Sequence, residues 1–105
     1  MAYPDAVLAA LSDPTRRAVL ELVGERPRPV GELAEELPIT RPAVSQHLRV
    51  LRDAGLLTET RDGTRRIYAL QPSGIKELVS YLQRFWVVSL DSYKRVAEAR
   101  DKERS

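Results

Sequence analysis

Side chains that can hydrogen-bond to DNA bases or phosphates gather between positions 41 and 52. They are Arg41, Ser45, Gln46, Arg49 and Arg52, which apart from the adjacent pair Ser45-Gln46 are three or four residues apart. On a helix with 3.6 residues per turn, this spacing gathers them on one face. A guanidinium group can bond to the O6 and N7 atoms of guanine, a glutamine amide can pair with adenine, and a serine hydroxyl can bond to a base or a phosphate. The segment therefore predicts a helix whose polar face enters the major groove of duplex DNA.

The other side of the same segment is apolar, which explains how such a helix would be held in place. Its apolar residues cluster within about 60° on a helical wheel; they are Val44, Leu48 and Leu51, with Val50 and Ala54 on their flank. Thr40 is a suitable N-cap, and Gly55 is a suitable stop at the C-terminal end. We expect the apolar stripe to pack on the preceding helices while the polar side stays exposed.

Prolines and capping residues divide the first forty positions into three short helices, expected at 5–11, 14–23 and 30–37. Asp13 can cap the second helix, and Pro14 fits its first position, where no N–H donor is needed. Gly24 is expected to end that helix, and the prolines within 26–29 make this stretch a non-helical connector. Pro38-Ile39 forms the turn before the fourth helix. Two helices joined by a tight turn are typical of a helix-turn-helix, with the fourth helix as its recognition helix.

The next segment reads as a β-hairpin with basic residues around its tip. We expect strands at 56–61 and 65–70, joined by a two-residue type I′ turn at Asp62-Gly63, because glycine tolerates the positive φ that this turn requires. Such a hairpin forms a wing, and its arginines would meet the sugar–phosphate backbone or a minor groove. The residues that we assign to DNA-backbone contacts are Thr40, His47, Arg52, Arg61, Thr64, Arg65 and Arg66.

The net charge of +2 is too small to identify a nucleic-acid-binding protein, but the distribution of charge is informative. Residues 1–40 carry four basic and seven acidic side chains, a net charge of −3. Residues 41–66 carry six arginines and three acidic side chains, a net charge of +3. Positive charge is thus concentrated on the predicted recognition helix and hairpin, where phosphates would lie. The alternative is that these arginines form an ordinary solvated face.

Apolar residues are dense in the last helix, which we expect to begin after a Ser73 cap and to run from Gly74 to about Glu98. Exposed apolar stripes of this width mark interaction surfaces, so we predict a homodimer formed by this helix together with the first one. The predicted interface residues are Val7, Leu8, Leu11, Leu78, Leu82, Phe85, Trp86, Leu90 and Tyr93. Two alternatives are that the helix only closes the core of one protomer, and that Phe85-Trp86 belongs to a cofactor site. The expected organisation is one domain at 1–98, followed by a charged, frayed tail at 99–105.

The chain has no cysteine and a single histidine, which excludes several kinds of site. Disulfides, iron–sulfur clusters and thiolate metal sites cannot form within it. His47 lacks a histidine or cysteine partner, so we expect no metal site and no cofactor, and we favour a structural or phosphate-contacting role for it. No catalytic cysteine, glycine-rich phosphate loop or convergent carboxylate–histidine set indicates an enzyme. With no signal peptide and no apolar run long enough to span a membrane, we expect a soluble cytoplasmic protein.

Four segments, in this order and spacing, closely resemble the ArsR/SmtB family of bacterial winged-helix repressors. They are SDPTRR (12–17) with AVLELV after it, GELAEEL, PAVSQHLRVLRDAGLL and the hairpin RDGTRRIYAL, within residues 5–97. The resemblance implies a mainly α-helical fold with a small β-hairpin wing, in the order α-α-α-α-β-β-α. It also implies a homodimer that represses transcription from an inverted-repeat operator until an effector loosens it, in the bacterial cytoplasm and on the nucleoid when bound. The family's base-reading positions correspond to Arg41, Pro42, Ser45, Gln46 and Arg49.

The chain departs from the family at its known metal sites. Many members sense metals through a cysteine pair in the third helix or through histidines and carboxylates in the last helix. This chain has no cysteine, and its last helix has no histidine. The resemblance is therefore to members without these sites, and the effector stays open between an organic molecule, a partner protein and none. A winged helix used only for protein–protein contact is the functional alternative, although such domains usually lose the basic residues that Arg49, Arg61, Arg65 and Arg66 supply here.

Overall fold

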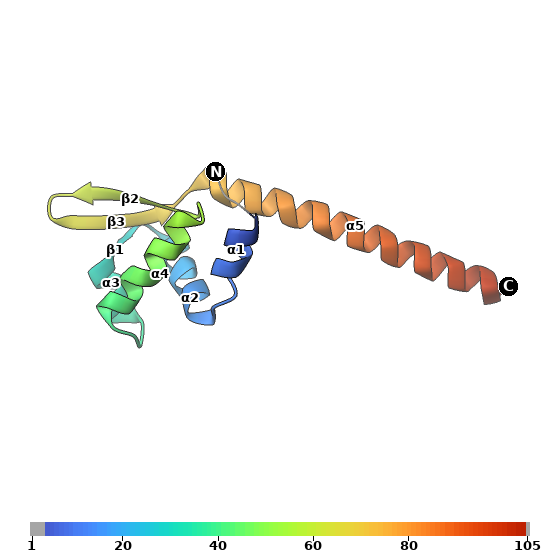
Figure 1. Cartoon of the computed structure of the whole chain (residues 1–105), viewed down its shortest axis with the longest axis horizontal. Coiled ribbons are helices and arrows are strands. Elements are labelled where there is room, and N and C mark those ends of the chain that lie inside the picture. Colours follow the sequence, from blue (N-terminus) through green and yellow to red (C-terminus); the bar gives the residue numbers. More distant parts are fainter. Residues whose placement is uncertain (1–3, 105) are drawn as a thin grey trace.

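The computed structural model describes residues 4–104, which form helices and a small sheet (Figure 1). The helices are α1 (Pro4–Ala10), α2 (Pro14–Glu25), α3 (Val30–Glu36), α4 (Arg41–Asp53) and α5 (Pro72–Arg104). The strands are β1 (Arg28–Pro29), β2 (Leu57–Asp62) and β3 (Arg65–Leu70). The first four helices pack beside the sheet, and α5 extends away from them as a long arm, so the molecule measures 70 × 28 × 21 Å. The predicted mainly helical fold with a hairpin wing is confirmed.

The apolar face of α4 lies at the centre of the hydrophobic core, as the helical wheel predicted. Val44, Leu48 and Leu51 are fully buried, and each such side chain contributes about 1.5–3 kcal/mol to stability. α4 packs on α2, α3 and β2. Among the described residues, the buried core comprises Val7, Ala10, Val19, Val23, Val30, Leu33, Val44, Leu48, Leu51, Ala54, Leu56, Leu57 and Tyr68. This packing fixes the orientation of α4, and with it the direction in which its polar side chains point.

The junction between α1 and α2 is closed by hydrogen bonds. The carboxylate of Asp13 accepts hydrogen bonds from the N–H groups of Thr15 (2.8 Å) and Arg16 (3.1 Å), as expected for an N-cap, and Pro14 occupies the first turn. The Nη1 atoms of Arg16 and Arg17 donate to the carbonyl oxygens of Ala10 (3.2 Å) and Leu11 (2.7 Å). These two bonds satisfy carbonyl groups that the end of α1 leaves free, and they tie α1 to α2.

The connector expected at 26–29 contains a short strand that the sequence did not reveal. In β1, Arg28 pairs with Tyr68 and Pro29 pairs with Ile67, which makes a three-stranded antiparallel sheet in the order β1-β3-β2. Proline is tolerated here because β1 is an edge strand. The expectation that Gly24 ends α2 is also wrong, since the helix continues to Glu25 and the extended backbone of Arg26 stops it. A two-residue strand is too short to produce a recognisable alternation of apolar and polar residues.

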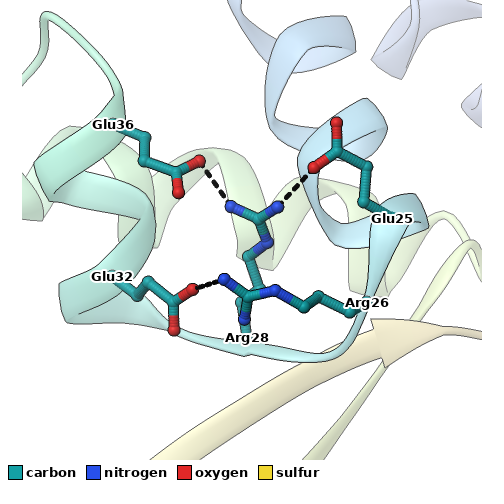
Figure 2. Close-up of polar contacts among 5 residues, drawn as sticks. All are labelled: Glu25, Arg26, Arg28, Glu32 and Glu36. Carbon is teal, nitrogen blue, oxygen red and sulfur yellow. Dashed lines mark hydrogen bonds and ion pairs between the residues drawn. The ribbon is translucent and has the colours of Figure 1, made fainter.

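The buried side chain of Arg28 anchors this strand through ion pairs with two more exposed glutamates (Figure 2). Its side chain is only 4% exposed, and its guanidinium group contacts Glu25 at the end of α2 (2.5 Å) and Glu36 at the end of α3. Beside it, Arg26 pairs with Glu32 of α3. The guanidinium group therefore joins the ends of two helices across β1, and it fixes the entry of the chain into the helix-turn-helix.

The turn of the hairpin lies one residue later than the sequence suggested. Asp62 is paired with Arg65, so the turn residues are Gly63 and Thr64 rather than Asp62 and Gly63. Gly63 has a positive φ of 64°, whereas no non-glycine residue among those described has a positive φ. A type I′ turn requires positive φ at both central residues, so this assignment was wrong; glycine in the first central position is the pattern of a type II′ turn.

The start of α5 lies directly against the turn between α4 and β2. Gly74 is buried, and a Cβ atom added there would lie 1.7 Å from the carbonyl oxygen of Gly55 and 2.8 Å from its carbonyl carbon. Gly55 itself has a φ of 86° and ends α4 as predicted. The absence of a side chain at Gly74 is therefore what allows the two backbones to approach so closely.

Gly74→Ala is expected to lower the free energy of unfolding by about 1–3 kcal/mol or more, because α5 must shift away from the backbone of Gly55. Gly24→Ala is the matched control, since an added Cβ there lies 3.8 Å from Leu70 Cδ1 in ordinary contact. Alanine is the better helix former, so this variant should be neutral or up to about 1 kcal/mol more stable. Urea denaturation at equal protein concentration measures both, and equal stability of the two variants would contradict this close packing.

α5 is longer than the sequence predicted. It runs to Arg104, so the predicted end near Glu98 is wrong and residues 99–104 are helical, while fraying of this segment stays a prediction. Residues 1–3 and 105 lie outside the described part. No glycine or proline occurs between positions 75 and 104. Ion pairs four residues apart, Asp91–Arg95 (2.6 Å) and Lys94–Glu98 (3.9 Å), add modest stability to the exposed part.

Candidate nucleic-acid interface

The polar side of α4 is open to solvent, as its sequence pattern predicted. Arg41, Pro42, Gln46 and Arg49 are exposed, and Ser45 is half-buried. The hydroxyl oxygen of Thr40 accepts a hydrogen bond from the N–H group of Ala43 (3.3 Å), which confirms Thr40 as the N-cap. Because the opposite side of the helix is locked in the core, these side chains form a fixed row of hydrogen-bonding groups on the surface.

The arginines expected to meet DNA fall into two groups. Arg41, Arg49, Arg61 and Arg65 are exposed and form no ion pair with any residue that the structure describes. Arg52 and Arg66, by contrast, are both held by Glu59 of β2, and Arg52 also pairs with Asp53 (3.3 Å). The arginines without an ion pair can bind a phosphate directly. Arg52 and Arg66 must first break their ion pairs before they can bind one.

Glu59 lies at the centre of a polar cluster between α4 and the wing. Its Oε2 atom lies 2.6 Å from Arg52 Nη1, and its Oε1 atom lies 3.4 Å from Arg66 Nε. The hydrogen bond from Arg52 holds the pKa of Glu59 below its ordinary value, and burial opposes this effect only in part. Burial, and then the nearby charge of Glu59, raise the pKa of Tyr68. Glu59 is therefore charged at neutral pH and connects the recognition helix to the wing.

A groove of about 760 Å³ lies between α3, the first turns of α4 and the wing. The residues that line it are Pro29, Val30, Gly31, Glu32, Glu35, Arg41, Ser45, Thr64, Arg65 and Arg66. Arg41 extends back over Gly31, where an added Cβ would lie 3.7 Å from its Nη1 atom. The groove brings residues predicted for base contacts and residues predicted for backbone contacts to the same concave surface.

His47 is half-buried, and a phosphate contact by it stays a prediction. Its Nδ1 atom is buried and has no hydrogen-bond partner among the residues that the structure describes. The hydrogen bond from the N–H group of Arg16 lowers the pKa of Asp13 at the start of α2. Among residues 4–104 no three histidine, cysteine, aspartate or glutamate side chains are grouped so that they could hold a metal ion. Nor is any helix within the described range long and apolar enough to cross a membrane.

The apolar stripe of α5 lies outside the core of the protomer. Ile75 and Leu78 pack against the core, but most of the stripe beyond them is exposed. The predicted interface residues that are exposed are Leu8 (43%), Leu82 (46%), Phe85 (60%), Trp86 (62%), Leu90 (48%) and Tyr93 (74%). Val7 differs, because it is 1% exposed and belongs to the core of its own protomer, and Leu11 also packs against that core. The helix therefore does more than close the core of one protomer.

Sequence reasoning missed several residues that position this surface. Arg28 and Glu59 look like ordinary surface charges in the sequence, and only the fold brings them to their partners. Arg16 and Arg17 belong to the SDPTRR segment, yet nothing in that segment indicated that they bond to the end of α1. For Arg28 the one available signal was its place before Pro29 in a short connector, which favours an extended backbone at that position.

Comparison with known proteins supports the same fold over most of the chain. A family model described as a helix-turn-helix domain matches residues 11–60. HTH-type transcriptional regulator Rv2034 of Mycobacterium tuberculosis is 47% identical over 96 residues, which cover 91% of this chain and 90% of the relative. Transcriptional repressor SdpR of Bacillus subtilis is 32% identical over 79 residues, covering 75% of this chain and 88% of the relative.

Solved structures extend the similarity to three dimensions. An ArsR-like transcriptional regulator from Rhodococcus sp. RHA1 is 30% identical with a TM-score of 0.73, covering 89% of this chain and 91% of that one. A second solved structure is the homodimeric winged helix-turn-helix DNA-binding domain of Mb0332 from Mycobacterium bovis, a possible ArsR-family regulator. It is 26% identical with a TM-score of 0.66, and the match covers 77% of this chain and 75% of that one. With its recognition helix, its wing and these relatives, the chain belongs to the ArsR/SmtB family of winged helix-turn-helix transcriptional regulators.

Proposed function

We propose that the chain is a homodimeric repressor that binds an inverted-repeat operator with α4 in the major groove and the wing on the DNA backbone. Family membership makes it a DNA-binding transcriptional regulator. The observation that carries the proposal is the division of α4, whose apolar face is fully buried while its polar face is open beside the wing. This arrangement presents a recognition helix to a groove without any rearrangement of the fold.

The residues of this surface divide by chemistry into two roles. We assign base contacts to the side chains whose donors and acceptors match base edges in the major groove, which are Arg41, Ser45, Gln46 and Arg49, with Pro42 packed beside them. We assign phosphate contacts to Thr40, Arg61, Thr64 and Arg65, which are exposed around the groove and the tip of the wing. Arg52 and Arg66 are paired with Glu59 in the absence of DNA, and His47 is half-buried. We therefore assign these three residues a smaller contribution to phosphate binding than the sequence alone suggested.

Dimerisation through α5 is supported by the uncovered apolar stripe and by a structural neighbour described as homodimeric. Two subunits related by a twofold axis would place their α4 helices about 34 Å apart, in successive major grooves. Repression is supported by the relative named a transcriptional repressor. No step of this function requires catalysis, and a regulator of this kind acts in the cytoplasm on chromosomal DNA.

Footprinting of the protein on the DNA upstream of its own gene is the direct test. Two protected half-sites of inverted sequence, one helical turn apart, are the expected result. Duplex affinity should also fall steeply as salt rises, because bound arginines release counterions from the DNA. A protein-interaction module would protect no duplex, and any residual binding would show no such salt dependence.

The wing variants Arg61→Ala and Arg65→Ala should weaken binding to operator and random DNA by similar factors. Each missing phosphate contact lowers the slope of log affinity against log salt by about 0.9, hence by about twice that for a dimer. Arg84→Ala removes the same charge from the exposed surface of α5 and serves as the control, with an unchanged slope expected. A slope that stays constant in both wing variants would remove the wing from the interface.

Excess Zn²⁺, Cd²⁺ or arsenite is expected to leave the operator complex intact. Zinc sites use about four ligands drawn from cysteine, histidine and carboxylate groups, and this chain offers no cysteine and an isolated His47. Electrophoretic mobility shift titrations with and without a chelator measure the effect. Release of DNA at micromolar metal that the chelator reverses would indicate a carboxylate site formed across the dimer.

A further inference from the structure

We infer that Glu59 acts as an internal substitute for a DNA phosphate, masking Arg52 and Arg66 and so limiting the strength of sequence-independent binding. This role rests on the proposed DNA-binding function. It makes Glu59 a residue of the DNA-facing surface that lowers affinity for DNA of any sequence. It concerns two arginines that would otherwise rank with Arg61 and Arg65 as backbone contacts.

The geometry of the cluster places Glu59 between the two arginines. Glu59 offers one carboxylate oxygen to each of them, at 2.6 Å from Arg52 Nη1 and 3.4 Å from Arg66 Nε. A carboxylate and a phosphate both present paired anionic oxygens to the guanidinium fork. The side chain of Glu59 thus supplies both arginines, from within the protein, with an anionic partner of the kind that a phosphate would be.

The backbone of β2 holds Glu59 in this position. Side chains alternate along a strand, so Glu59 lies on the same face of β2 as Leu57, which is buried against the core. Its partner in the register with β3 is Tyr68, which is also buried. Arg52 approaches from the last turn of α4, and Arg66 from β3, two residues before Tyr68. The carboxylate is therefore fixed between the recognition helix and the wing rather than free on a flexible surface loop.

Burial differs between the carboxylate and the arginines that it holds. The side chain of Glu59 is only 16% exposed, whereas those of Arg52 and Arg66 are 38% and 54% exposed. If both arginines moved to phosphates, a mostly buried carboxylate would be left unpaired, which is a large penalty. A phosphate contact at the exposed edge of the protein is a weak, screened interaction by comparison. The internal pairs are therefore expected to persist when the protein lies on DNA.

Masking the two arginines changes how the protein distributes between operator and other DNA. Every arginine that binds phosphate adds to affinity for any duplex, whatever its sequence. Withholding two arginines per subunit lowers this general affinity and leaves the free row on α4, Arg41 to Arg49, to contact bases. In a dimer whose Arg52 and Arg66 are masked, a smaller fraction of the protein would be bound to the large excess of non-operator DNA.

Glu59→Gln is the test, because glutamine keeps the size of the side chain and removes its charge. On a random-sequence duplex, the slope of log affinity against log salt between about 50 and 200 mM should steepen by about 0.9 for each additional phosphate that the variant binds, and affinity at the low-salt end should rise on the order of tenfold. Asp62→Asn removes the same charge from the tip of the same strand, where Asp62 forms no ion pair within the described range, and should leave the slope nearly unchanged.

Two further variants keep the inference testable if Glu59→Gln should fold poorly. In the unmodified background, Arg66→Ala should lower the slope on random DNA much less than its neighbour Arg65→Ala does. In the Glu59→Gln background, Arg66→Ala should reverse part of the increase. A slope that falls equally in Arg65→Ala and Arg66→Ala, or a Glu59→Gln variant that folds but binds random DNA more weakly, would overturn the inference and make Glu59 a residue that aims the arginines at DNA.

The outcomes separate this inference from the function on which it rests. If no duplex is bound by the unmodified protein, the proposed function itself fails. If the unmodified protein binds DNA with a steep salt dependence that Arg65→Ala reduces, but Glu59→Gln and Asp62→Asn behave alike, the function stands and the masking role of Glu59 is wrong.

Discussion

Leu82→Glu or Trp86→Glu is expected to separate the dimer into monomers and to abolish tight operator binding, although every residue of the DNA-facing surface is intact. The two side chains lie on the apolar stripe of α5 and are 46% and 62% exposed in the protomer. A charge buried without a partner in an interface costs several kcal/mol. One recognition helix contacts only a few base pairs, so a lone subunit would also lose the affinity that two half-sites provide together.

Arg84→Glu is the matched control for this prediction. Arg84 is exposed on the same helix, and because it is two residues from both Leu82 and Trp86, it lies about 200° around the helix from each of them. The same charge placed there should leave the dimer and its operator affinity intact. Sedimentation of the three variants and of the unmodified protein provides the measurement. A folded, unmodified protein that stays monomeric at tens of micromolar and still binds a palindromic site tightly would refute both the interface and the twofold arrangement.

Arg49→Ala is expected to weaken operator binding by about 1–3 kcal/mol per half-site and to relax the preference for one base pair in each. Arg49 is exposed near the centre of the polar face of α4, and it forms no ion pair with any residue in the described part of the chain. Its guanidinium group is therefore free to form a bidentate contact with guanine. Such a contact distinguishes one base pair from another, which a phosphate contact does not.

The comparison of two duplexes distinguishes base reading from simple loss of charge. Arg49→Ala should lose much more affinity for the operator than for a random sequence, whereas Arg61→Ala on the wing should lose similar factors on both. Binding isotherms at a single salt concentration are sufficient. If Arg49→Ala loses the same factor on both duplexes, Arg49 contacts the backbone and the assignment of base reading to it is wrong.

The recognition helix was predictable from the sequence because its information is local. Apolar residues at helical spacing, a threonine cap and a glycine stop all occur within positions 40–55, and the structure confirms the buried face of Val44, Leu48 and Leu51. The hairpin was predictable for the same reason, although its turn was placed one residue early. A shift of this size changes no hydrophobic pattern when both strand ends are exposed and polar, so only the pairing of Asp62 with Arg65 reveals it.

The fold class, the polar row on α4, the basic wing and the apolar stripe on the last helix could all be predicted from patterns within the sequence. Which of these residues are free to contact DNA or a second subunit depends on the packing of the whole chain. This packing paired Arg52 and Arg66 with Glu59, buried Arg28 between Glu25 and Glu36, and placed Val7 in the core of its own protomer. The physical reason is that helical periodicity and capping depend on residues a few positions apart, whereas a salt bridge or a buried contact depends on groups that only the packing of the whole chain brings together.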